Sequence, residues 1–409
     1  MKTSALVRRK FLVELVIIGI IALAHESIIV RTNAAARLVR LPLARGITQQ
    51  AGQYGQPTVT YSTQIQIGTP PKNFLVQFDL DLQEHFVPHY SWNPFNRNLH
   101  YGTGFQCKVS SSCKKDDRSV SVDYQNCQLT GKKYEDFVSL FALPDGYQAN
   151  TAPVNQTNNV QTSKLIKWRQ NFLAVSSASD GRFSQLPIDG FLGLAPTPQS
   201  ATGLKSILVS LHEQKQIDNL QISMWFNPVL DSPNGGELIL GGVDPARYQG
   251  QIYWHHLSTT NYNRWSLGLQ TVTLGNQYVS CLAGSNCQVR FSSALSDIYG
   301  PPEDVKKIHT LLNTSPQSNG LQLIDCRRMA QLPTLSFMID GIPYAMLPSN
   351  YIRKTVDGVI FKKETCYVAI LPNNEMSSNS EWILGNNFLG AYYSIYDVTY
   401  RQIGFAALR

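Results

Sequence analysis

The sequence predicts an all-β protein folded into two lobes. Its 409 residues are enough for two domains with substantial cores, and 43% apolar with 15% charged residues is the composition of a globular chain. From residue 53 to residue 226, short runs of β-branched and aromatic residues alternate with turn residues, and few stretches keep a 3.6-residue period. We therefore expect many short strands and few helices.

Two segments are expected to be helical. Gly203–Gln216 places leucine and isoleucine side chains on one face, which is the pattern of an amphipathic helix. Pro302–Leu312 has a proline and two acidic residues in its first turn, followed by apolar residues at helical spacing.

Residues 1–24 are typical of a secretory signal peptide, because Lys2, Arg8, Arg9 and Lys10 precede an apolar run from Phe11 to Ala24. That run is shorter than the ~20 residues that cross a bilayer, so we expect no stable membrane anchor, with a signal anchor as the alternative. The protein is accordingly expected outside the cell or in the lumen of the secretory pathway.

The positive charge of the chain lies mainly at its start. Residues 1–45 hold eight basic and two acidic side chains, a net of +6, so the remainder carries only +1 of the overall +7. The body contains no Lys/Arg block that would follow a phosphate backbone, and we expect no nucleic-acid partner.

The segment around Asp79 has the form of a catalytic strand and turn. Ile65–Phe74 predicts a strand, a Pro/Gly turn and a second strand, so Asp79 is expected where an apolar strand ends and a substrate could approach. The residues that follow are Leu80, Asp81 and Leu82.

With Phe86-Val87-Pro88 after it, this segment resembles the first active-site segment of the pepsin-like aspartic proteases (peptidase family A1), where the family has Asp-Thr-Gly-Ser. Cys287–Pro301 resembles the second segment in register, with Ser292 at the place of the second catalytic aspartate and Ala294 at that of a glycine. Asp189–Ala195 and Glu381–Gly390 match two further family segments. The resemblance extends from Ile65 to Ala406.

The resemblance implies a bilobal pepsin-like fold with a cleft between the lobes. We expect an N-terminal lobe at residues 51–228, which carries a flap, and a C-terminal lobe at residues 229–409. Tyr124 matches the tyrosine of the flap, the hairpin that covers bound peptide in the family. A packed hairpin aromatic is the alternative interpretation of this residue.

Residues 25–50 look like the basic propeptide that covers the cleft in zymogens of the family. Their cationic side chains would then pair with carboxylates of the cleft and mask them. A simple flexible leader is the alternative, and the sequence leaves both open.

The cysteines agree with a secreted disulfide framework. The resemblance implies the pairs Cys107–Cys113, Cys281–Cys287 and Cys326–Cys366. Cys127 is left over as a buried thiol, an intermolecular bridge or a redox-sensitive group, and the first is favoured. Asn155 and Asn313 lie in sequons, and are possible glycosylation sites.

The chemistry of the family requires two facing carboxylates that share one proton and activate a water molecule. A hydroxyl at Ser292 cannot serve as base or acid in place of the second carboxylate, so we expect little or no peptide hydrolysis. The alternative is an active endopeptidase in which Asp81 or Asp297 partners Asp79. Metal binding is a lesser alternative, suggested by Asp79, Asp81, Glu84, His85, His89 and His100.

The sequence thus predicts a secreted, catalytically inactive member of the family that binds a peptide or protein between its lobes. We expect a monomer, and the residues imply no cofactor.

Overall fold

The computed structural model describes residues 36–48, 56–92, 104–124, 127–144, 164–179, 187–229, 232, 234–259, 263–281, 286–357, 363–373 and 380–409. Residues 38–409 belong to one compact unit. The expected signal peptide, His100 and Asn155 lie outside the described residues. No helix in the described part of the chain is both long and apolar enough to cross a membrane.

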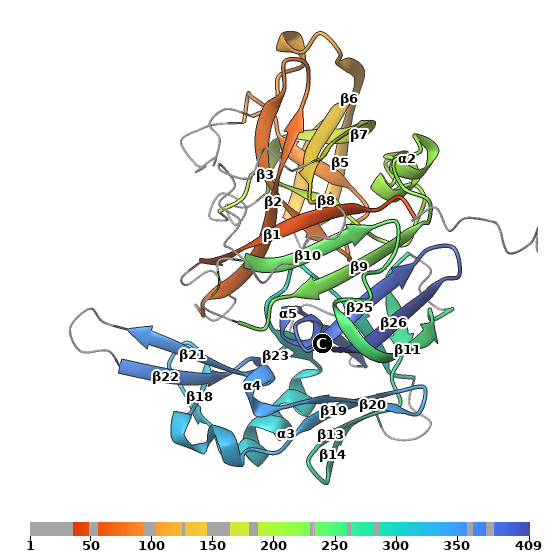
Figure 1. Ribbon diagram of the computed structural model, residues 1–409. Coiled ribbons are helices and arrows are strands. Elements are labelled where there is room, and N and C mark those ends of the chain that lie inside the picture. The colour runs from red at the N-terminus through yellow and green to blue at the C-terminus, as the bar shows by residue number, and fades with distance from the viewer. Residues whose placement is uncertain are drawn as a thin grey trace, which may run out of the picture. The chain divides into compact units, whose positions relative to one another are not determined.

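Strands dominate this unit (Figure 1). The largest sheet has 13 strands in the order β11-β26-β25-β9-β10-β1-β2-β3-β8-β4-β7-β6-β5. Its strands are β1 (Val39–Thr48), β2 (Thr58–Ile67), β3 (Lys72–Asp79), β4 (His85–Pro88), β5 (Lys114–Tyr124), β6 (Cys127–Ala142), β7 (Lys164–Ala178), β8 (Gly190–Gly193), β9 (Gln221–Phe226), β10 (Asn234–Leu240), β11 (Tyr248–His256), β25 (Tyr392–Asp397) and β26 (Gln402–Leu408).

Three smaller sheets follow in the second half of the chain. They consist of β12 (Ser266–Gly268), β15 (Gln288–Phe291), β24 (Glu381–Leu384), β16 (Ile298–Gly300) and β23 (Ile370–Pro372); of β14 (Gln277–Ser280), β13 (Thr271–Leu274), β19 (Leu335–Ile339) and β20 (Ile342–Met346); and of β17 (Ser315–Pro316), β18 (Gln322–Ile324), β22 (Lys363–Val368) and β21 (Ile352–Asp357). The prediction of an all-β, two-lobed fold is confirmed.

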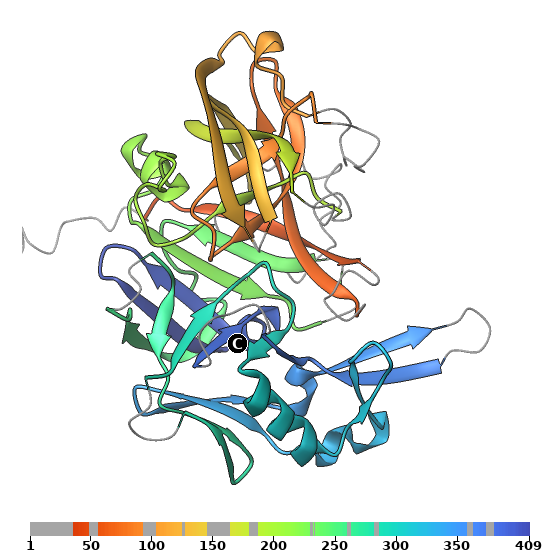
Figure 2. The ribbon, with the colours of Figure 1, turned by 180° about the vertical axis from the view of Figure 1, so that it is seen from behind.

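Helices are short and few among the described residues. They are α2 (Ile207–Glu213), α3 (Pro302–Leu312), α4 (Pro348–Tyr351) and α5 (Asn386–Leu389), with 3₁₀ turns at Cys107–Val109 and Cys326–Gln331. Helix α3 has the predicted bounds and packs against β14, β16 and β23; it is the teal helix in the rear view (Figure 2). Helix α2 begins four residues later and ends three residues earlier than predicted, and the ψ of 143° at its N-cap residue Ser206 lies outside the helical region.

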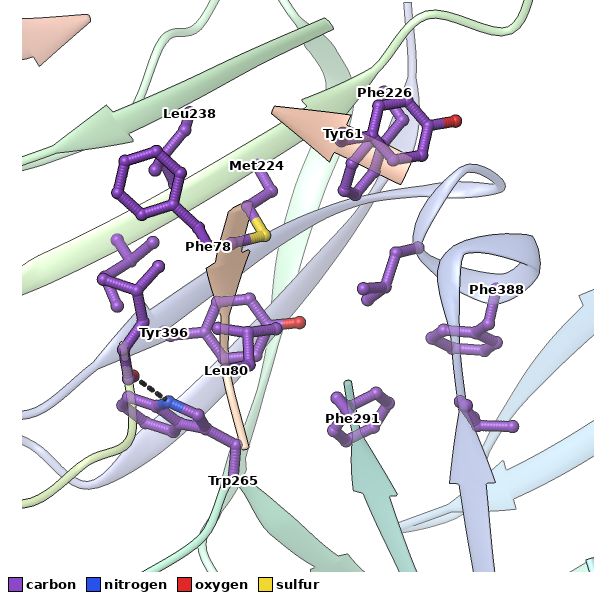
Figure 3. Close-up of a cluster of buried hydrophobic side chains, with 14 of the residues drawn as sticks. Tyr61, Phe78, Leu80, Met224, Phe226, Leu238, Trp265, Phe291, Phe388 and Tyr396 are labelled. Carbon is purple, nitrogen blue, oxygen red and sulfur yellow. Dashed lines mark hydrogen bonds between the residues drawn. The ribbon is translucent and has the colours of Figure 1, made fainter. Parts of the chain in front are cut away.

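The two strands that carry the motifs are built alike. Strand β3 runs parallel to β8, with Asp79 opposite Gly193, and β15 runs parallel to β24, with Phe291 opposite Leu384. Parallel strands buried on both faces are apolar almost throughout, which is what the residues before Asp79 show. Figure 3 shows Phe78 and Leu80 in the core beside Trp265 and Tyr396. This packing fixes where each strand ends.

The described cysteines form three disulfide bonds, Cys107–Cys113, Cys281–Cys287 and Cys326–Cys366, the pairs that the resemblance implies. Cys127 is a buried free thiol, and Ser179 Oγ lies 3.6 Å from its sulfur. Asn313 is exposed at the C-terminal end of α3.

The propeptide interpretation of residues 25–50 predicts cations on the carboxylates of the cleft, and the two arginines of β1 have other partners. Arg40 pairs with Glu237 and Asp244, and Arg45 donates to backbone carbonyls of residues 227 and 229. Because β1 lies between β10 and β2, its side chains are held within the sheet and away from Asp79.

His85 on β4 makes the stability of the fold sensitive to pH. Both ring nitrogens are used: Nδ1 accepts from the N–H of Gly193 at 3.1 Å, and Nε2 lies 3.0 Å from the carbonyl oxygen of Lys205. Burial lowers the pKa of His85 from 6.5 to about 4. The unfolded chain therefore binds the proton more tightly, and the stability that neutral His85 contributes is complete above pH 6.5 and is lost as the pH falls toward 4.

We expect the free-energy advantage of the wild type over His85→Gln to shrink by about 2–3 kcal/mol between pH 7.5 and pH 4.5. Denaturant unfolding at several pH values measures this gap, and acidic groups common to both proteins cancel in it. His256→Gln, at an exposed position on β11, is the control and leaves the pH dependence unchanged. A gap that does not change with pH would contradict the assignment.

Candidate active site

Asp79 is a fully buried carboxylate at the end of β3. Its side chain has 0% exposure, and its backbone oxygen accepts from the N–H of Leu194 at 2.8 Å. Strand β3 is buried up to its last residue, so the Asp79 side chain lies in the interior and not in solvent. Burying an unpaired ionised carboxylate is costly, so its oxygens need hydrogen-bond donors.

Ser292 faces Asp79 from the other half of the chain. It follows β15, and its backbone N–H donates to Leu384 O at 3.2 Å on the neighbouring strand. Its Oγ donates to Asp79 Oδ1 at 3.5 Å, at the limit of a hydrogen bond, and its side chain is 1% exposed. The structure thus brings together the two positions that the motif register pairs. One carries a carboxylate and the other a hydroxyl.

Ser293 ties the two strand ends together. Its Oγ donates to Phe78 O at 2.8 Å and accepts from the N–H of Leu80 at 3.2 Å, while its backbone oxygen accepts from Gln77 Nε2 at 3.2 Å. Leu80, which follows Asp79 as Ser293 follows Ser292, has an apolar side chain that is buried in the core and forms no hydrogen bond. Of these two residues, only Ser293 therefore uses its side chain to hydrogen-bond across the two halves.

Tyr124, on the β5–β6 hairpin, contacts Asp79 directly. It is the last residue of β5 and pairs with Cys127 across the hairpin. Its hydroxyl donates to Asp79 Oδ2 at 2.5 Å, while its ring packs edge-on against Phe86 and Phe191. The residue is therefore both a packed aromatic and a hydrogen-bond donor to the carboxylate.

Asp81 turns its carboxylate to the other half of the chain. Its backbone N–H donates to Asp79 Oδ1 at 2.9 Å, but its side chain accepts from Arg290 and lies 3.8 Å from Arg264 Nε. Arg290 also donates to Glu381 at 3.2 Å. The second carboxylate of a proton-sharing pair would face Asp79, and Asp81 is instead held by two guanidinium groups.

Asp297 lies elsewhere, buried with 1% exposure. Its Oδ2 accepts from Gln56 Nε2 at 3.3 Å. Burial raises its pKa to about 6, against the lowering effect of the Arg353 charge. Asp297 also lies near Tyr367, whose pKa its negative charge raises. The expectation that Asp297 could partner Asp79 finds no support in this geometry, because the residue lies in the turn that follows the Ser292 motif and contacts other groups.

The lesser alternative, a metal site, is not assembled by the described residues. They contain no group of three His, Cys, Asp or Glu side chains placed to hold one ion. His85 uses both nitrogens inside the fold, and His89 lies against Ser91 and Tyr134.

The surroundings of Asp79 set its protonation. Burial and the charge of Asp81 raise its pKa, while the hydrogen bonds from Tyr124 and from the Asp81 N–H and the charge of Arg290 lower it, and the net result is a pKa of about 6. Asp79 is thus protonated in mild acid and ionised above pH 6. Burial and the Asp79 charge raise the pKa of Tyr124, which remains a donor throughout.

Comparisons with known proteins show which family the chain belongs to. The model of the family described as eukaryotic aspartyl protease matches residues 60–163 and 145–408. The chain belongs to the eukaryotic aspartyl protease family. It is 28% identical to cathepsin E-B of Xenopus laevis over 85% of this chain and 79% of that protein, and 28% identical to gastricsin of Macaca fuscata fuscata over 85% and 83%. It is 27% identical to cathepsin D of Mus musculus over 85% and 80%.

Within this aspartyl protease chain, sequence reasoning missed the cluster of Arg264, Arg290 and Glu381 around Asp81. A signal was present, because Arg290 lies two residues before Ser292, and in extended backbone two such side chains project from the same face. An arginine in a buried strand is rarely found without an acidic partner, and Asp81 is such a partner here.

We expect Tyr124→Phe to destabilise the protein by about 1.5–3 kcal/mol at pH 8, because it removes a hydrogen bond to an ionised carboxylate. The loss is smaller at pH 5, where Asp79 is protonated. The pKa of Asp79 is higher in the folded protein than in the unfolded chain, so the contribution of Asp79 to stability is lost as the pH rises through 6. The Tyr124 hydroxyl lowers this pKa, so removing it makes the loss larger. Thermal unfolding at both pH values measures the difference.

Tyr351→Phe is the matched control, since that hydroxyl donates to the neutral carbonyl of Pro333 at 2.5 Å and its loss is independent of pH between 5 and 8. Equal pH dependence in both variants would show that Tyr124 does not stabilise the Asp79 carboxylate.

Proposed function

We propose that this protein is a secreted member of the aspartyl protease family that does not cleave peptides and instead binds a peptide or protein segment between its lobes. The observation that carries the proposal is the pairing of Asp79 with Ser292 in place of a second carboxylate. Three disulfides support an oxidising compartment, which is where secreted proteins fold.

The absence of a second carboxylate removes the step on which the family's chemistry depends. A pair of carboxylates splits its two titrations, so that one is a base while its neighbour is an acid. Asp79 alone titrates with a single pKa and has no coupled acid beside it. The Ser292 hydroxyl, whose pKa is far above neutral, cannot take that second role. Residues that act as a unit lose most of their benefit when one is removed.

The alternative of an active enzyme needs Asp81 as the partner. In that case the Asp81 carboxylate must leave Arg290 and Arg264 and turn to Asp79, which breaks a part-buried ion pair between the two halves. Breaking one partner from a buried pair is costly, about 3–5 kcal/mol. No observation favours this rearrangement.

We expect the purified protein to show no cleavage of denatured casein between pH 3 and pH 6, at the same background as Asp79→Asn. Cathepsin D, assayed alongside it, reports that the conditions suit the family. Pepstatin-sensitive cleavage that disappears in Asp79→Asn would overturn the proposal, and its loss in Asp81→Ala would identify the partner.

A gain of activity tests the cause. Ser292→Asp with Asp81→Gly and Ala294→Gly restores the family residues at these three positions, and Arg290 keeps Glu381 as its partner. The matched control is the same set of changes with Ser292→Asn, which has the size of aspartate but no titratable proton. Activity in the first set and none in the second supports loss through the pair.

Binding without cleavage is tested with a displayed library of random peptides. We expect selected peptides to bind the wild type and to bind Arg264→Glu at least tenfold more weakly, because Arg264 is 40% exposed and lies beside Asp81. Lys354→Glu, on the β21–β22 hairpin, reverses the same charge elsewhere and is the control. Failure to select any peptide, or equal loss in both variants, counts against a binding role.

A further inference from the structure

We propose that strand β1 is a permanent part of the folded protein and is not removed as a pro-segment. The mature chain then begins upstream of Leu38. This inference concerns the leader and is independent of whether the protein cleaves peptides. It rests on four observations: the position of β1 in the large sheet, the burial of its side chains, the ion cluster around Arg40, and the length of chain that would replace it.

The first observation is the strand order. Strand β1 pairs with β10 through Val39–Ala44 and with β2 through Ala44–Thr48. In the 13-stranded sheet the only described link between the strands from β11 to β10 and those from β2 to β5 is β1. Figure 1 shows β1 crossing beside β10 at this junction. Removing it would divide the sheet and expose two strand edges, each with unpaired backbone groups.

The second observation is burial on one face of the strand. Val39, Leu41 and Leu43 are 0–4% exposed and belong to the main hydrophobic core. They alternate along β1, as side chains on one face of a strand do. Loss of the strand would therefore open the core as well as the sheet.

The third observation is the charge cluster on the opposite face. Arg40 is 6% exposed; its Nε donates to Glu237 Oε1 at 2.5 Å and its Nη2 to Asp244. Arg247 donates to Glu237 Oε2 at 2.8 Å, so two guanidinium groups balance two carboxylates. Without Arg40, the acidic pair on and beside β10 would be left with one cation in a buried place. Arg40 is thus part of an ion cluster within the sheet.

The fourth observation is that the chain holds no substitute. Cleavage after residue 50 would leave residues 51–57, seven residues, ahead of β2 at Thr58. Seven extended residues reach about 23 Å, against about 33 Å for a ten-residue strand, and part of that length must turn back from β2. The remaining segment cannot refill the place of β1.

The test cuts the chain between β1 and β2. A recognition sequence for a highly specific protease is inserted between Gln50 and Ala51 of the full chain, the protein is cut, and the products are separated by native size exclusion and identified by mass. We expect the fragment that ends at the cut to co-elute with the body, or the body to unfold when the fragment leaves. Release of the fragment with the body still monodisperse and its Tm unchanged would overturn the proposal.

Two variants of the cut protein identify the contacts. Arg40→Met is expected to release the fragment at least tenfold faster, since it leaves the Glu237–Asp244 pair under-compensated. Ile47→Thr, at a side chain that is 58% exposed on the same strand, is the matched control and leaves the release rate unchanged. Equal release from both would show that the ion cluster does not hold the strand.

The N-terminus of the uncut wild type, expressed through a secretory pathway, gives an independent readout. We expect N-terminal sequencing to place it before Leu38. A folded product that starts between residues 49 and 58 would overturn the proposal whatever the cut protein does.

Discussion

The structure depends on the burial of one carboxylate at the junction of its two halves. Asp79 is inaccessible to solvent, and each described donor that reaches it comes from a different place: the hairpin through Tyr124, the adjoining turn through the Asp81 N–H, and the second half of the chain through Ser292. A buried charge is tolerated only with such partners. The carboxylate therefore holds three segments together, apart from any reaction it could take part in.

Asp81 and Arg290 lie far apart in the sequence and form an ion pair in the folded protein. Asp81 stands where the turn has a glycine in the family, and Arg290 lies on the strand that leads to Ser292. Their side chains meet across the junction, with Glu381 on the far side of Arg290. The arginine also lowers the pKa of Asp79, which burial raises. Asp81 thus forms an ion pair with Arg290 in the other half of the chain. While this ion pair is intact, the Asp81 carboxylate does not face Asp79 as a second acid would.

The fold class followed from local patterns, whereas the location of the site came from the resemblance of two segments to a family. The apolar run that ends at Asp79 predicted a strand, and the proline and acids at the start of Pro302–Leu312 predicted helix α3. The partners of individual charges were not predictable. Arg290 and Asp81 are 209 residues apart, and Arg40 and Glu237 are 197 apart, so only the packed sheets bring them together. For the same reason, the sequence could not show that Arg40 pairs with Glu237 and Asp244.

Ser293 explains how a family fold can lose its second carboxylate without opening at the junction. The bonds from its hydroxyl to Phe78 O and from the Leu80 N–H to it are made by the residue beside the catalytic position and not by the position itself. Asp79 needs a donor at residue 292, and a hydroxyl meets that need with one proton. The requirements for closing the two halves are therefore weaker than those for sharing a proton between two acids. A chain that meets the first set keeps the strands, turns and hairpin of the family in place, and the absence of cleavage proposed above is compatible with that architecture.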